Sequence, residues 1–201
     1  SQPARQAGGR VFAKFALIVL VIGAIGLNID SFTNIQNPLV TLSQKQYEFN
    51  QLAFGQLTDS NHHPIPVANS LIEINKLEPT FYSFLRNSPK ALVNTLLRPF
   101  IWESKSPMIL LAGLETLLII FISILVLLFI KPLKEIKWEH VLFCFSFVLV
   151  QFLIIGETTP ILGAIARYKT IALPFLVIGL LFLLDKDRLL KKMPFLKKIL
   201  N

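Results

Sequence analysis

The apolar residues of this chain are gathered into blocks rather than spread evenly along it. A helix needs about 20 predominantly apolar residues, within a range of about 17–25, to cross a bilayer. Blocks of this kind occupy residues 12–28, 107–130, 139–156 and 168–184. The pattern predicts an all-α integral membrane protein with about four transmembrane helices and a long segment between the first two.

The ends of these blocks carry residues that favour helix starts, stops and bends. Ser106 and Pro107 suit the start of the second block, and Lys131 and Pro132 suit its end. Pro174 is expected to kink the fourth block, because proline removes a backbone donor from the helix.

The first block follows basic residues, as the apolar part of a secretory signal peptide does. A small-residue cleavage site should then follow, but the chain continues with the letters NIDSFTN. We therefore interpret 12–28 as a retained span.

The distribution of Lys and Arg predicts the orientation of the spans. Of the 20 basic residues, three lie near the N-terminus, three at 131–138 and six at 185–201, whereas 29–106 carries six basic and six acidic residues. Cytoplasmic segments of membrane proteins are enriched in Lys and Arg. We therefore expect both termini in the cytoplasm and the long segment 29–106 on the other side of the membrane. The expected divisions are a basic N-terminal segment (1–11), four spans (12–28, 107–130, 139–156 and 168–184), an outer helical loop (29–106), a cytoplasmic loop (131–138), a short outer loop (157–167) and a basic tail (185–201).

The outer segment 29–106 is too long and too apolar for a passive connection. We expect helices near 41–54, 67–77 and 88–100, the last with Ser88 as its cap and Pro89 at its first position. In this last helix Val93 and Leu96 share an apolar face, opposite the polar face that holds Asn94. The helix either rests on the outer membrane surface or packs against the spans.

Composition and charge narrow the classes of function. The chain is 53% hydrophobic and 16% charged, against about 25% charged residues in soluble domains. Its net charge of +8 does not predict nucleic-acid binding, because the basic residues cluster at the cytoplasmic membrane surface, where anionic lipids attract them. His62 and His63 stand without Cys, Asp or Glu at metal-ligand spacing, and Cys144 reads as a buried apolar residue. The chain has no motif of a nucleotide, metal or serine-hydrolase site, so we expect no cofactor.

Charged residues near the outer ends of the spans are the candidates for chemistry. Glu115 lies within the second predicted span, where a carboxylate must face protein or water. Arginine can hold a phosphate by paired hydrogen bonds, and a carboxylate can act as a base or orient the arginine. We expect six residues to meet at one outer rim: the phosphate-binding candidates Arg98, Arg167 and Lys169, the catalytic candidates Glu103 and Glu157, and Glu115. The alternative is a set of structural ion pairs and hydrogen bonds.

Three stretches carry a resemblance to known proteins: LLRPFIWE at 96–103, LAGLETLL at 111–118 and GETTPILGAIARYKTIALPF at 156–175. The pattern resembles the C-terminal half of polytopic inner-membrane proteins of Bacteroidetes-type bacteria, encoded with surface-polysaccharide genes. The chain departs from that pattern at Ile171, near which a proline is often seen. The matching residues are Arg98, Pro99, Phe100, Trp102, Glu103, Glu115, Gly156, Arg167, Tyr168, Pro174 and Phe175.

The last stretch is also similar to a late segment of multi-span lipid-linked-sugar glycosyltransferases and polysaccharide polymerases. The resemblance implies that the chain handles polyprenyl-phosphate-linked glycans, by glycosyl transfer, polymerisation or ligation. Four spans are few for such enzymes and the chain begins without Met, so we expect an N-terminal half to be missing. The alternative is a non-catalytic subunit of an envelope complex or transporter, with other membrane subunits as partners and with structural charges.

Overall fold

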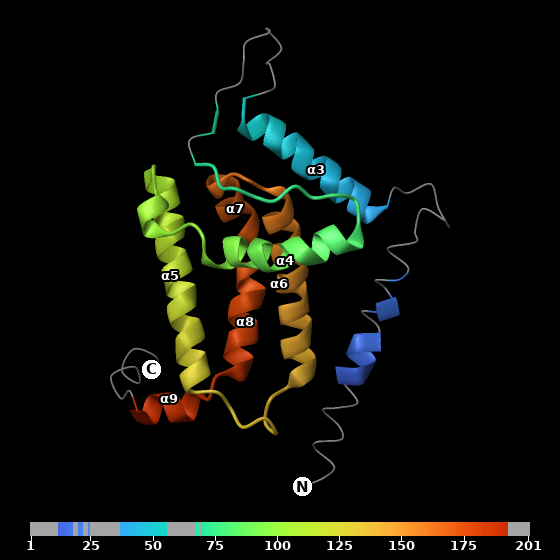
Figure 1. The fold of residues 1–201 in the computed structure, drawn as a ribbon. Helices are drawn as coiled ribbons and strands as arrows, with labels where there is room; N and C mark the ends of the chain where they lie inside the picture. Colours follow the sequence, from blue (N-terminus) through green and yellow to red (C-terminus); the bar gives the residue numbers. More distant parts are fainter. Residues whose placement is uncertain are drawn as a thin grey trace.

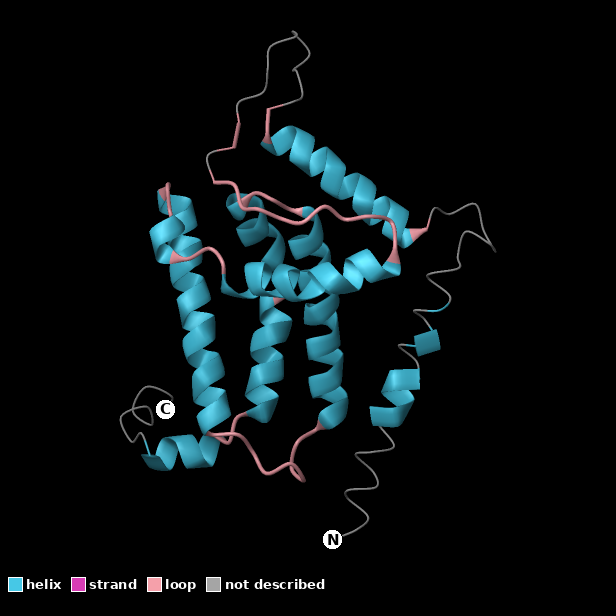
Figure 2. Ribbon diagram, in the orientation of Figure 1, coloured by secondary structure: helices cyan, strands magenta, loops and turns pink. Residues whose placement is uncertain are grey.

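The computed structural model describes residues 12–17, 20–21, 24, 37–55, 67–68 and 70–192. Within these ranges the regular elements are helices and no strand is formed (Figure 2). Two isolated β-bridges join Leu71 to Ile161 and Ile130 to Leu184. The elements are α3 (Pro38–Ala53), α4 (Phe81–Leu97), the 3-10 helix η1 (Ile101–Glu103), α5 (Pro107–Leu128), α6 (Trp138–Thr158), α7 (Leu162–Lys169), α8 (Leu173–Leu183) and α9 (Lys186–Lys192).

Three long segments stand side by side, with α8 between α5 and α6 (Figure 1). Two of them, α5 and α6, are long and apolar enough to cross a membrane, and the bent pair of α7 and α8 makes a third if it forms one span. A buried apolar cluster joins α5, α6 and α8 and includes Val126, Val148 and Leu176. The described residues therefore form an all-helical protein with two to three candidate membrane spans.

The start predicted for the second span is confirmed. Ser106 caps α5 by accepting a hydrogen bond from the Ile109 backbone N–H at 3.4 Å, and Pro107 occupies the first turn. The fourth predicted span, 168–184, corresponds mainly to α8, and residues 162–167 of the predicted outer loop belong to α7. The two helices meet at an angle of 57°, and this bend lies before Pro174 rather than at it. Pro174 stands in the first turn of α8, where its missing N–H costs no helical hydrogen bond.

A lobe covers the end of the bundle at which α5 begins and α6 ends (Figure 1). It consists of α3, α4 and residues 70–79, which we call the strap. The prediction of a helix over 67–77 is wrong for the strap, which is not helical at any of its residues. Its backbone bonds elsewhere: Ile72 N–H donates to the Pro160 carbonyl at 2.8 Å, and the Ser70 carbonyl accepts from Leu162 N–H at 2.9 Å. Tertiary hydrogen bonds therefore replace helical ones in this segment.

The predicted start of the helix at 88–100 is also wrong, because α4 begins seven residues earlier, at Phe81. Thr80 caps it by accepting a hydrogen bond from Ser83 N–H at 3.3 Å. Ser88 does not cap; its hydroxyl donates to the Phe84 carbonyl at 2.8 Å. Pro89 lies inside the helix at an exposed position.

The face of α4 that packs against α6 is formed by small and polar residues. Gly156 of α6 leaves room for this crossing, since a Cβ built on it would overlap the Ala91 carbonyl oxygen. Thr95 donates its hydroxyl to the Phe152 carbonyl of α6 at 3.0 Å. Of the two alternatives for this helix, packing against a span is confirmed, and the helix makes this contact with its polar side.

Several predicted features fall outside the described residues. Of the predicted first span, residues 12–17, 20–21 and 24 are described and helical. The rest of that span, the basic segment 1–11, the pair at 62–63 and the tail from residue 193 are not described.

Candidate functional site

The segment RPFIWE at 98–103 connects α4 to α5 and folds back on itself. The guanidinium of Arg98 pairs with the Glu103 carboxylate at 3.4 Å, and both side chains are partly buried. The other oxygen of Glu103 accepts a hydrogen bond from Phe100 N–H at 3.1 Å. Glu103 therefore holds the segment in shape as well as neutralising Arg98.

Aromatic rings extend this arrangement. The rings of Phe100 and Trp102 stack with centroids 4.7 Å apart, and the guanidinium carbon of Arg98 lies 5.9 Å from the Phe100 centroid. A cation over an aromatic face is attracted by the ring quadrupole. Arg98 is thus held by a carboxylate and a ring of its own segment.

Lys169, the last residue of α7, is a buried charged residue that hydrogen-bonds to this segment. It is 2% exposed. Its ammonium donates to the Arg98 carbonyl at 3.0 Å and to the Thr116 hydroxyl of α5 at 2.6 Å. The Glu115 carboxylate also attracts it electrostatically. Lys169 therefore ties α7, α5 and the 98–103 segment together, because a buried ammonium requires polar partners.

A groove of about 850 Å³ lies between α5 and α7. Its walls are mostly apolar, and among the described residues that line it Glu115 and Arg167 carry charge. Arg167 is exposed in the last turn of α7, and Glu115 is half-buried on α5. Gly163 widens the groove, since a Cβ there would meet no heavy atom within 4 Å. The remaining lining residues are Ser106, Met108, Ile109, Leu111, Ala112, Leu114, Leu118, Ala166 and Thr170.

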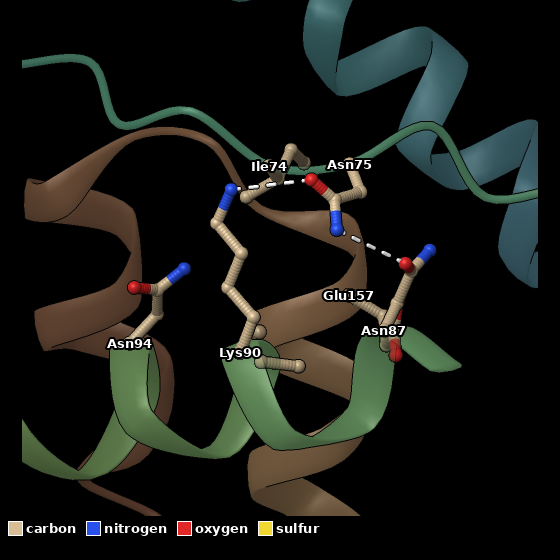
Figure 3. A pocket seen from close by; sticks show the side chains of 8 residues that line it. Ile74, Asn75, Asn87, Lys90, Asn94 and Glu157 are labelled. Carbon is tan, nitrogen blue, oxygen red and sulfur yellow. Dashed lines mark hydrogen bonds between the residues drawn. The ribbon is translucent and has the colours of Figure 1, made fainter. Parts of the chain in front are cut away.

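Glu157 lies elsewhere, in a polar niche where α4 and the strap meet the end of α6 (Figure 3). The niche has a volume of about 10 Å³, enough for a single water molecule. Glu157 is 2% exposed and Asn94 is 5% exposed. The Oε1 atom of Glu157 and the Nδ2 atom of Asn94 are buried without a hydrogen-bond partner. A water molecule that accepts from the amide and donates to the carboxylate would satisfy both.

A chain of side-chain hydrogen bonds closes the niche toward the strap (Figure 3). Lys90 donates to the Asn75 side-chain oxygen at 3.2 Å, and the Asn75 amide donates to the Asn87 oxygen at 3.1 Å. Gln46, a buried residue of α3, donates to the carbonyls of Asn75 at 2.8 Å and Glu157 at 2.7 Å. Hydrogen-bonded amides of the strap and α4 therefore border the niche, and Gln46 of α3 holds the strap to the end of α6.

The six predicted site residues are distributed over three settings rather than one cluster. Arg98 and Glu103 form a pair within one segment, with Lys169 bonded to the backbone of that segment. Glu115 and Arg167 line the groove, and Glu157 lines the niche.

Sequence reasoning missed four residues that build these settings: Thr116, Gln46, Asn75 and Asn87. Their sequence signal is weak. Asn87 stands seven residues before Asn94, so the two share a helical face that is polar, but nothing in the sequence pairs that face with Asn75.

Comparison of the chain with protein-family models, curated proteins and solved structures finds no match. The fold and the groove define the class: an all-helical protein with two to three candidate membrane spans and a charged, largely apolar groove between two of its helices.

Proposed function

We propose that this chain is a polytopic protein of the bacterial inner membrane that handles polyprenyl-phosphate-linked glycans during surface-polysaccharide assembly. The groove between α5 and α7 is the observation that carries the proposal. Its volume of about 850 Å³ lies within the range of about 300–1,000 Å³ that is usual for ligand sites. Its apolar walls suit a prenyl chain, and its two charged residues suit the phosphorylated end.

Arg167 and Glu115 have complementary roles in this proposal. Arg167 is exposed at the groove, so its guanidinium is available to bind phosphate oxygens by paired hydrogen bonds. Glu115 takes the place of the base: its carboxylate accepts the proton of an acceptor hydroxyl. The hydroxyl oxygen then bonds to the anomeric carbon of the lipid-linked sugar, whose bond to the phosphate oxygen breaks. The departing phosphate keeps the electron pair, and Arg167 stabilises its charge.

The other candidates support this pair. Lys169 and the Arg98–Glu103 pair fix the 98–103 segment against α5 and α7, which keeps Glu115 and Arg167 on opposite walls. Glu157 acts through the α4–α6 contact rather than on the ligand, because its carboxyl faces the niche.

The proposed topology has four spans, with both termini in the cytoplasm and the lobe outside. A cysteine placed at Lys45 of α3 should react with a membrane-impermeant maleimide in intact spheroplasts, because α3 belongs to the lobe. A cysteine at Lys134, in the connection between α5 and α6, should react only after the membrane is opened. Labelling of Lys134→Cys in sealed spheroplasts, or protection of Lys45→Cys, would reverse or abolish this topology.

Binding of undecaprenyl phosphate to the purified chain in nanodiscs tests the groove. Arg167→Ala removes a charge-assisted hydrogen bond worth about 1.5–3 kcal/mol, so the dissociation constant should rise about 10- to 150-fold. Arg188→Ala is the control, because Arg188 is an exposed arginine in α9 at the opposite end of the bundle. Equal affinities of the Arg167→Ala variant and the wild type, with unchanged thermal unfolding, would refute the assignment of Arg167.

A non-catalytic envelope subunit is the second candidate, and one observation favours it. Arg98, Glu103 and Lys169 are engaged in contacts within the protein, as structural charges would be. Under this alternative, the Arg167→Ala variant binds undecaprenyl phosphate no differently from the wild type. The variant instead retains less of a co-purifying membrane protein.

A further inference from the structure

An apolar stripe runs along the exposed side of α4. Tyr82, Leu85, Pro89, Val93 and Leu96 recur at intervals of three or four residues, so they share one face of the helix. Leu85 is 58% exposed and Val93 is 52% exposed. We call these five residues the α4 stripe. It faces away from the protein along the length of the helix.

The buried side of α4 has the opposite character. Its buried residues are Asn87, Ser88, Ala91, Asn94 and Thr95. Helices on the surface of water-soluble proteins bury their apolar face and expose their polar face. In α4 the polar face is buried and the apolar face is exposed. This arrangement suits a helix whose outer side contacts lipid rather than water. Its buried hydroxyls are satisfied internally, as when Thr95 donates to the carbonyls of Ala91 and Phe152, each at 3.0 Å.

Basic residues occupy one edge of the α4 stripe. Arg86 and Lys90 are exposed, four residues apart, and therefore on one side of the helix. Lys90 extends toward the strap, where it donates to Asn75 (Figure 3). The strap lies between α4 and α3, on the side of α4 away from α9 (Figure 1). The basic edge thus faces the lobe, and the apolar stripe faces sideways from the bundle.

The apolar surface continues from α4 onto its neighbours. Trp102 and Met108 are strongly exposed where the chain passes from α4 into α5. Along α5, a candidate membrane span, Leu117, Phe121 and Leu127 are exposed as well. Tyr and Trp are enriched at the interface between membrane and water, and Lys and Arg extend to that interface from apolar surroundings.

From these observations we infer that α4 is an in-plane membrane helix, with the α4 stripe in the acyl-chain region of one leaflet and with Arg86 and Lys90 at the lipid phosphates. Amphipathic helices that lie in a membrane interface have this division between an apolar face and a basic edge. The basic edge favours lipid over a second copy of the chain as the occupant, because the same edge on a copy would repel it, whereas lipid phosphates attract it.

Nitroxide accessibility in nanodiscs of mixed phosphatidylglycerol and phosphatidylcholine tests this inference on the full chain. Cys144→Ala provides a background without other thiols, since Cys144 is the single cysteine. Spin labels are placed one at a time at Leu85, Val93 and, as a control, Lys45 on α3. We expect oxygen, which concentrates in lipid, to relax the labels at Leu85 and Val93 more than a water-soluble nickel chelate does. The label at Lys45 should show the reverse.

Two outcomes would overturn the inference. Stronger relaxation by nickel at Leu85 and Val93 would place the α4 stripe in water. Protection from both reagents would show that protein covers it, either a second copy or residues 12–28 of the same chain. Labels at Tyr82 and Leu96 give a second, independent pair if a variant at Leu85 or Val93 fails to fold. Because no label lies on the groove, the result does not depend on which ligand the groove binds.

Discussion

Glu115 and Glu157 belong to α5 and α6, two long helices that follow each other in the sequence, and lie toward the same end of the bundle, but they face different spaces. Glu115 lines an open groove of about 850 Å³ with largely apolar walls. Glu157 lines a small niche of about 10 Å³ whose other polar lining residues are three asparagines and Lys90. The same residue type, placed near the end of an apolar helix, is therefore part of a ligand-sized space in one case and of an internal joint in the other.

The two spaces differ in size because the neighbouring helix approaches closely at Glu157 but not at Glu115. At Glu157, α4 approaches α6 so closely that a Cβ on Gly156 would overlap the Ala91 backbone. At Glu115, α7 stands away from α5, and a Cβ on Gly163 would meet nothing within 4 Å. Glu157 thus follows a glycine that permits close helix contact, whereas Glu115 lines a groove together with a glycine that leaves space.

The two carboxylates also differ in their countercharges. Glu115 attracts the buried ammonium of Lys169. Glu157 forms no ion pair with another described residue, and one of its oxygens has no hydrogen-bond partner. Burial without a countercharge makes a charged carboxylate costly, so the two residues stand in opposite electrostatic surroundings.

Of the variants that test this contrast between niche and groove, Gly156→Ala should change the free energy of unfolding most. The added methyl group would overlap the Ala91 carbonyl, and backbone atoms cannot move aside as a flexible side chain can. We expect the free energy of unfolding to fall by about 3 kcal/mol, at the upper end of what overpacking usually costs. Unfolding in detergent micelles by increasing dodecyl sulfate measures the change.

Gly163→Ala is the matched control, because the same methyl group enters open space on α7. Its free energy of unfolding should stay within about 0.5 kcal/mol of the wild type. If both alanine variants were equally stable, α4 would not be seated on α6 as described, and the contrast between niche and groove would fail.

Much of the bundle could be predicted from the sequence because long apolar blocks have few alternatives in a membrane. The Ser106–Pro107 start of α5 followed from local capping, whereas Pro174 stands in the first turn of α8 instead of kinking a continuous span. The lobe was harder. The strap has no helix because its backbone bonds to residues about 90 positions away, such as Pro160, and no local pattern indicates such a partner.

The candidate site was predictable in its members but not in its arrangement. Charged residues near apolar blocks identified Glu115, Arg167 and Lys169. Their separation into a groove and a set of supporting contacts depends on Thr116 and on the backbone carbonyl of Arg98, the two acceptors of the Lys169 ammonium. Thr is common in helices and every residue has a carbonyl, so neither acceptor could be recognised in advance.

The smallest expected changes in the free energy of unfolding come from replacing each carboxylate by glutamine, one at a time. Glu157→Gln removes a charge from the niche, where no cation pairs with it, and keeps the shape of the side chain. The free energy of unfolding should rise by about 1 kcal/mol. Glu115→Gln removes the attraction between that carboxylate and Lys169 and should lower the free energy of unfolding by about 0.5 kcal/mol. Dodecyl sulfate titrations at pH 8 compare the two variants with the wild type in one experiment.

The two changes in the free energy of unfolding should have opposite signs, because the Glu157 charge has no countercharge and the Glu115 charge is matched by Lys169. A loss of stability in both variants would mean that Glu157 has a partner of its own, and the niche would then resemble the groove in its electrostatics after all.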